Sequence, residues 1–235
     1  MSAFVTMTAE KIESERRRSR PVEKPKKVAV IKRNKARVGI VLVIIAIIII
    51  AALAVIYIHP AKNRIAVIDT TMGTIRVELY EDKAPITTAN FIKLVNTGFY
   101  SGLVFHRVAN LNVSAPTTHI IQGGGFYANG TYKQSPFGSI NLETNSDLVH
   151  DDGAIAMART TDKNSATSQF YICDGPQHSL DGKYAVFGKV VDNTSMVVVK
   201  AIANVQTTTK TVMGQSMPDW PVNNVIIRSI TIQNQ

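Results

Sequence analysis

Three side chains of the sequence, Ser168, His178 and Asp181, could together form a nucleophilic triad. Such a triad needs its serine on a sharp, exposed turn beside an oxyanion-binding motif. Ser168 lies instead in a segment typical of a β-strand, and no G-x-S-x-G elbow surrounds it. The sequence therefore does not favour hydrolysis.

The patterns for metal and phosphate chemistry are missing as well. The histidines, at positions 59, 106, 119, 150 and 178, lack the spacing of metal ligands, and the single cysteine, Cys173, has no partner cysteine. The glycines 123–125 could cradle a phosphate, but no helix start follows them, which favours a tight turn or a bulge. We expect neither a metal nor a cofactor, and we expect Cys173 to be a buried, inert thiol.

Residues 165–172, Ser-Ala-Thr-Ser-Gln-Phe-Tyr-Ile, could bind a ligand from a strand. Polar and apolar residues alternate near the end of this segment, so Gln169 and Phe170 would project from opposite faces. Gln169 could then offer its amide to a ligand while Phe170 anchors the strand in a core. The pattern alone is more typical of an ordinary core strand.

Short alternating segments and closely spaced turns predict the elements that position these residues. We expect strands at 64–69, 74–80, 103–108, 120–126, 153–158, 165–172, 184–191 and 225–232, with an edge element at 141–143, helices at 84–98 and 195–203, and loops at 109–118 and 204–224. No strand–helix–strand repeat occurs in this order. The sequence therefore predicts a mainly β fold, a closed antiparallel β-barrel capped by two α-helices.

The first 58 residues differ from the rest. Residues 1–37 carry twelve basic and four acidic side chains, which accounts for +8 of the formal net charge of +9. The remainder is nearly neutral, so the charge gives no support to nucleic-acid binding by the folded part. Residues 38–58 contain no charged side chain and would span roughly 31 Å as a helix, about the thickness of a bilayer core.

This apolar run is longer than that of a cleavable signal peptide, which favours an uncleaved transmembrane anchor. The positive-inside rule then predicts a single-pass protein of the cell membrane. Residues 1–37 would be a basic, disordered cytoplasmic tail, residues 59–63 a short linker, and residues 64–235 an extracytoplasmic domain. The helix 38–58 would contact membrane lipid.

Five segments of the chain carry a family resemblance. In chain order they are Phe105–Val108, Gln122–Gly124, Met157–Thr160, Asn164–Ile172 and Leu180–Val190. Together they resemble the cyclophilin family of peptidyl-prolyl cis-trans isomerases, over about residues 64–232. The resemblance implies an eight-stranded antiparallel barrel with two capping helices and a chemistry that needs no cofactor.

The resemblance implies that Arg107 is the catalytic residue. Rotation about an X-Pro amide is slow because the C–N bond has partial double-bond character, which gives a barrier of roughly 18–20 kcal/mol. A guanidinium that donates to the prolyl nitrogen draws its lone pair out of resonance and lowers this barrier. Arginine suits the task because it stays charged and presents a rigid fork of donors.

The resemblance also implies a substrate-binding set around Arg107. Its members are Gln122 and Gln169 for the peptide backbone, Ala158 and Arg159 for the residue before proline, and Ile120, His119, Tyr171, Leu180 and Tyr184 for the wall and rim of a proline pocket. The chain departs from the family in two places. Eleven residues separate Arg107 from His119, more than is usual, and Ser179 stands where many members have tryptophan.

The sequence thus predicts a membrane-anchored isomerase that acts on proline-containing polypeptides as exported or surface proteins fold, with a monomeric domain. Two other interpretations remain open. The fold could serve as a proline-peptide-binding chaperone with reduced or lost turnover, or as a scaffold that the basic tail links to a partner.

Overall fold

The computed structural model describes residues 37–50, 63–111 and 118–234. The chain divides into two units, residues 1–61 and 62–235. In the first unit residues 37–50 are helical. Of the helices in the described ranges, none combines the length and the apolarity that crossing a bilayer requires. Residues 51–58 of the predicted anchor, nearly all of the predicted tail and most of the linker lie outside the described residues.

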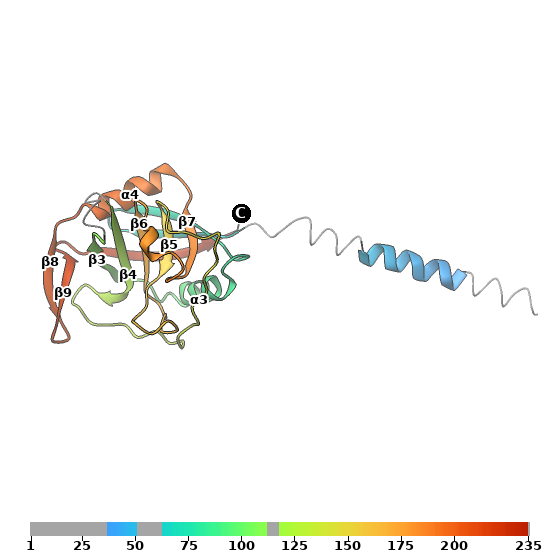
Figure 1. The fold of residues 1–235 in the computed structure, drawn as a ribbon, viewed down its shortest axis with the longest axis horizontal. Coiled ribbons are helices and arrows are strands. Elements are labelled where there is room, and N and C mark those ends of the chain that lie inside the picture. The colour runs from blue at the N-terminus through green and yellow to red at the C-terminus, as the bar shows by residue number, and fades with distance from the viewer. Residues whose placement is uncertain (1–36, 51–62, 112–117, 235) are drawn as a thin grey trace, which may run out of the picture. The chain divides into compact units, whose positions relative to one another are not determined.

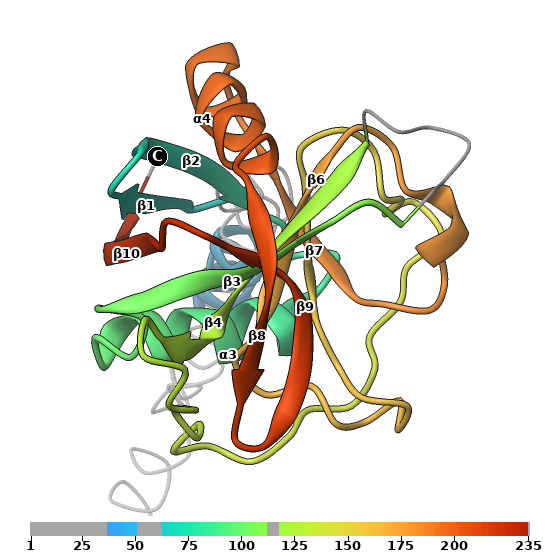
Figure 2. The same cartoon turned by 90° about the vertical axis from the view of Figure 1, so that its left-hand side faces the viewer.

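Eight strands of the second unit close into an antiparallel barrel (Figures 1 and 2). The strands are β1 (Ile65–Thr70), β2 (Gly73–Leu79), β3 (Leu103–Ala109), β4 (His119–Tyr127), β5 (Ala154–Met157), β6 (Phe170–Asp174), β7 (Val186–Val190) and β10 (Val225–Gln233). Around the barrel they follow the order β1, β10, β3, β4, β6, β5, β7, β2. The predicted mainly β, eight-stranded barrel is confirmed.

Apolar alternation fills the barrel interior. Ile75, Val77 and Leu79 of β2 are fully buried, as the period of two predicts. A cluster of aromatic rings from distant parts of the chain completes the core, with Phe91 at 5.3 Å from Tyr100 and 5.2 Å from Phe187 between ring centroids. The barrel is therefore a packed core, and ligands must bind on its surface.

Two helices lie on opposite sides of the barrel, α3 (Pro85–Asn96) and α4 (Asn193–Ala203) (Figures 1 and 2). Pro85 fits the first turn of α3 because its missing N–H would have no partner there. The carboxylate of Glu143 accepts from the backbone N–H groups of Ile86 and Thr87, at 3.1 and 2.8 Å. The prediction of an edge element at 141–143 is wrong, since Glu143 caps a helix instead.

A second sheet replaces most of the loop predicted at 204–224. Strands β8 (Thr207–Val212) and β9 (Gln215–Pro221) form a hairpin outside the barrel. Its two-residue turn, Met213-Gly214, has positive φ angles of 50° and 77°, the conformation that a tight hairpin turn requires. The loop prediction is wrong because most side chains of β8 are exposed, so the strand shows no alternation of polar and apolar residues.

Strand β6 begins later than predicted, at Phe170. The backbone before it bonds to side chains, since Asn90 donates to the carbonyl of Thr167 at 2.7 Å and Tyr100 to that of Ser168 at 2.9 Å. Together with an isolated bridge between Ala166 and Ile140, these bonds stand in place of a continuous strand ladder. The glycines 123–125 lie inside β4, where the pairing with β3 shifts register, so the predicted bulge is confirmed.

Candidate active site

One cavity of about 390 Å³ gathers most of the predicted site residues. Eight of the ten line it, namely Arg107, Ile120, Gln122, Ala158, Arg159, Tyr171, Leu180 and Tyr184. Leu111 and Ser179 complete the lining. The cavity is therefore built from β3, β4, β6, the residues after β5, and the short 3-10 helix η1 (His178–Leu180) with the segment that follows it.

Strand pairing explains why these side chains meet. Arg107 of β3 lies opposite Gln122 of β4, which lies opposite Tyr171 of β6. Directly opposed residues on neighbouring strands project from the same face, so the three side chains form one row. Ile120, two residues before Gln122, projects from this face as well. A guanidinium, an amide and a phenol ring thus converge on one cavity.

A second amide lies behind this row. Gln122 donates through Nε2 to Oε1 of Gln169 at 3.0 Å. Gly125 leaves room for this arrangement, because a Cβ there would lie 2.7 Å from the side chain of Gln169. Gln169 therefore does not line the cavity itself but orients Gln122, which does.

The ring of Tyr171 is fixed by a buried polar network that sequence reasoning missed. His150 Nε2 lies 2.9 Å from the Tyr171 hydroxyl, and His150 Nδ1 lies 2.7 Å from Oδ1 of Asp181. The carboxylate can only accept, so the imidazole donates from Nδ1 and accepts the phenol proton at Nε2. Burial lowers the pKa of His150, against the opposing effect of Asp181, which agrees with this neutral form. No spacing in the sequence links positions 150, 171 and 181.

The triad considered from the sequence does not assemble. The hydroxyl of Ser168 is buried and donates to the carbonyl of Gly124 at 3.0 Å. Asp181 instead binds His150 and, through Oδ2, Nδ1 of the exposed His178 at 3.0 Å. The serine is therefore part of the core and has no access to a substrate.

His119 is the predicted site residue that the structure does not bring to the Arg107 cavity. It lines a different cavity, where its Nδ1 lies 3.9 Å from Oδ2 of Asp174. Consecutive residues of β4 project from opposite faces, so Ile120 faces the Arg107 cavity and His119 does not. Leu111 supplies apolar lining beside Arg107 instead. Its position four residues after Arg107, on the same face of an extended chain, is the signal that could have identified it.

Arg159 is held at the rim of the cavity. Its guanidinium donates to the carbonyl of Lys183 at 2.8 and 3.0 Å and lies over the ring of Tyr184, at 4.6 Å from the ring centre. These contacts fix the position of the side chain but leave its charge at the rim.

His106, next to Arg107 on β3, projects away from the cavity. Its ring is 1% exposed and packs against Phe126 and Trp220, at 4.7 and 5.8 Å between ring centroids. Burial lowers the pKa of His106 to about 4, although contacts with Val104 and Gln169 oppose the shift. The residue therefore stays neutral and supports the strand by packing against these two rings.

The lowered pKa of His106 predicts that the fold loses stability in acid. Because the pKa of His106 is lowered from about 6.5 to about 4 on folding, the unfolded chain binds an extra proton between these values. The stability that the neutral His106 imidazole contributes is fully present above pH 6.5 and is lost as the pH falls through 4, by a total of about 3 kcal/mol. Denaturant unfolding at several pH values should show this slope in the wild type and a flatter slope in His106→Phe. Equal slopes in the wild type and in His106→Phe would contradict a lowered pKa of His106 in the folded protein.

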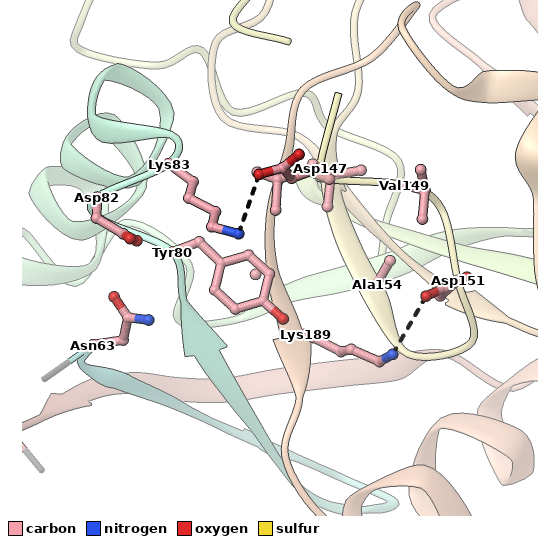
Figure 3. Close-up of a pocket in the computed structure, with 12 residues that line it drawn as sticks. Asn63, Tyr80, Asp82, Lys83, Asp147, Val149, Asp151, Ala154 and Lys189 are labelled. Carbon is pink, nitrogen blue, oxygen red and sulfur yellow. Dashed lines mark ion pairs between the residues drawn. The ribbon is translucent and has the colours of Figure 1, made fainter. Parts of the chain in front are cut away.

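A third pocket, of about 340 Å³, contains none of the predicted site residues (Figure 3). Its lysines already face carboxylates, with Lys83 at 3.7 Å from Asp147 and Lys189 at 3.7 Å from Asp151. Figure 3 shows both ion pairs at the pocket wall. Asp82 adds a third carboxylate to this lining, so the pocket has a net negative charge, whereas the Arg107 cavity presents the guanidinium groups of Arg107 and Arg159 beside apolar walls.

Comparisons with known proteins point to one family. The family model described as cyclophilin type peptidyl-prolyl cis-trans isomerase/CLD matches residues 65–232. A peptidyl-prolyl cis-trans isomerase of Acinetobacter baylyi is 41% identical over 179 residues, 73% of this chain and 89% of the relative. Peptidyl-prolyl cis-trans isomerase B of Escherichia coli is 36% identical over 172 residues, 69% of this chain and 96% of the relative.

Solved structures share the fold. The crystal structure of a cyclophilin type peptidyl-prolyl cis-trans isomerase of Cryptosporidium parvum, in the presence of the dipeptide Ala-Pro, superposes with a TM-score of 0.57. It is 24% identical and the match covers 73% of this chain and 99% of that chain. The family model and the curated relatives carry the assignment of activity. The chain belongs to the cyclophilin family of peptidyl-prolyl cis-trans isomerases.

Proposed function

We propose that the Arg107 cavity binds an X-Pro segment and that Arg107 catalyses rotation about its amide bond. The row of Arg107, Gln122 and Tyr171 across three neighbouring strands is the observation that carries this proposal. As the amide twists, the prolyl nitrogen loses resonance and gains a localised lone pair. A guanidinium that donates to this nitrogen stabilises the twisted state more than the planar ground state, which is the requirement for catalysis.

The other lining residues explain how the proline is held in this proposal. Ile120, Leu180 and the ring of Tyr171 form an apolar wall for the pyrrolidine ring. The amide of Gln122, held by Gln169, can bond to the peptide backbone. No proton transfer or covalent step is needed, so positioning and electrostatics supply the rate enhancement. The Cryptosporidium parvum relative, studied with Ala-Pro, supports proline-containing peptides as the ligand class.

The test of this function is a protease-coupled assay with the full chain in mild detergent and a peptide whose X-Pro bond starts in cis. The cis-to-trans rate should rise in proportion to protein concentration. Binding of the same peptide without faster isomerisation would overturn the catalytic proposal and favour the chaperone or scaffold interpretation.

We also propose that residues 38–58 anchor the protein in the cell membrane, with the amino terminus cytoplasmic and the isomerase domain outside. Support comes from the 21-residue run without charge and from the +8 tail before it. The domain would then assist the folding of exported or surface proteins. Protease treatment of intact cells should degrade residues 64–235 and spare an epitope at the amino terminus, and the reverse pattern would overturn this topology.

A further inference from the structure

The β8–β9 hairpin brings a carboxylate to Arg107 from outside the barrel. Nε of Arg107 lies 3.6 Å from Oδ2 of Asp219 on β9. Among the residues that the structure describes, this is the ion pair that Arg107 makes. Both side chains are about one-third exposed, at 34% and 38%. An ion pair in such contact with solvent contributes little to stability.

The backbone at Asp219 is strained. Its φ is 63°, in the left-handed region, which a residue with a Cβ adopts at a free-energy cost, although aspartate tolerates it better than most. Strained positions of this kind persist where the surrounding structure holds them, and they are concentrated at functional sites. A weak, half-exposed ion pair does not offset such strain. Stability therefore does not explain why an aspartate stands here.

The residue after Asp219 holds β9 in place. Trp220 is 1% exposed and packs against His106 and Phe126, the first of which precedes Arg107 on β3. Lys210 of β8 lies over the Trp220 ring at 4.6 Å and donates to the carbonyl of Ala128 at 2.6 Å. These contacts fasten the hairpin to the outer face of β3 and β4. The backbone that carries Asp219 is thus held beside the arginine.

We propose that Asp219 positions the guanidinium of Arg107 for the isomerisation reaction. Arginine has many rotamers, and an unconstrained side chain at the edge of a cavity samples most of them. The carboxylate lies on the Nε side of the guanidinium, so its charge favours one orientation of the arginine side chain and leaves both terminal nitrogen atoms available to the substrate. The role of the β8–β9 hairpin in this proposal is to place the carboxylate of Asp219 beside Arg107. The inference rests on the proposed catalytic role of Arg107.

The experiment compares full-chain variants in the X-Pro assay and in thermal unfolding. Asp219→Asn keeps the shape of the side chain and its tolerance of a positive φ, but removes the charge. We expect kcat to fall about 5- to 10-fold with KM within about twofold of the wild type, because substrate contacts are unchanged. Asp219→Gly removes the strain as well, so it should lose the same activity without a lower melting temperature.

The matched control is Asp69→Asn. Asp69 pairs with a different arginine of the barrel, Arg228, at 3.4 Å, so this variant should keep the wild-type kcat. The double variant Arg107→Ala/Asp219→Asn should be no slower than Arg107→Ala alone, because Asp219 acts through Arg107.

The outcomes separate the two proposals. If Asp219→Asn keeps full kcat, raises KM alone, or adds its effect to that of Arg107→Ala, the positioning role is overturned and the catalytic role of Arg107 stands. If Arg107→Ala keeps full activity, the proposed function itself fails. A fall in kcat that accompanies a matching fall in melting temperature for both Asp219 variants would assign Asp219 a structural role instead.

Discussion

Replacing Arg107 with alanine is expected to lower kcat/KM for an X-Pro peptide by about 10²- to 10³-fold, the usual effect of removing one preorganised donor to a transition state. The reason is that the rest of the cavity can still bind proline but cannot withdraw the prolyl lone pair from resonance. The side chain is 34% exposed and lies outside the core. The melting temperature should therefore change little, and the loss should lie in kcat rather than in KM.

Two variants make this result interpretable. Arg107→Lys keeps the charge but loses the planar fork of donors, so it should recover only a small part of the activity. Arg228→Ala removes the same group from the barrel surface, where it pairs with Asp69 at 3.4 Å and donates to the carbonyl of Thr70 at 2.9 Å. Its activity should equal that of the wild type. Equal rates for Arg107→Ala and Arg228→Ala would exclude Arg107 as the catalytic group.

The barrel strands were predictable because burial imposes a period of two on them. In β2, Ile75, Val77 and Leu79 face the core and the residues between them do not. Strand β8 was missed because it lies at the barrel surface, where five of its six residues are at least partly exposed. Burial therefore imposes no alternation of polar and apolar residues on this strand. The start of β6 was misplaced for a related reason. Before Phe170 the backbone forms an isolated bridge from Ala166 to Ile140, and it accepts side-chain hydrogen bonds at Thr167 and Ser168.

The site was predictable where its residues lie in short motifs on neighbouring strands. Arg107, Gln122 and Tyr171 meet because their strands pair, and the alternation within each strand fixes the shared face. Asp219 and His150 were not predictable. Each meets its partner through tertiary packing of distant segments, 112 positions apart for Arg107 and Asp219, and such contacts leave no periodic signal. The face of β4 on which His119 lies depends on the residue at which that strand begins. The number of residues between Arg107 and His119 does not determine this.

The largest effect on stability is expected from Phe170→Ala. Phe170 is fully buried, and its ring lies 5.6, 5.5 and 6.0 Å from those of Phe91, Tyr100 and Phe105. The truncation should lower the free energy of unfolding by about 3–5 kcal/mol, since apolar contact is lost and a cavity remains. For a domain of this size that corresponds to a fall of about 10 °C or more in melting temperature.

Phe137→Ala is the matched control, because it removes the same ring from a partly exposed position at the edge of the core, beneath the ammonium group of Lys93. Its loss should be about 1 kcal/mol. Fluorescence of Trp220, the single tryptophan, reports unfolding of both variants, since this ring is buried against β3. The neighbours of Phe170 in the chain, Gln169 and Tyr171, act on the other face of β6, so Phe170→Ala should retain activity well below its melting temperature. A variant as stable as the wild type would mean that the aromatic cluster does not hold the strand that carries this site.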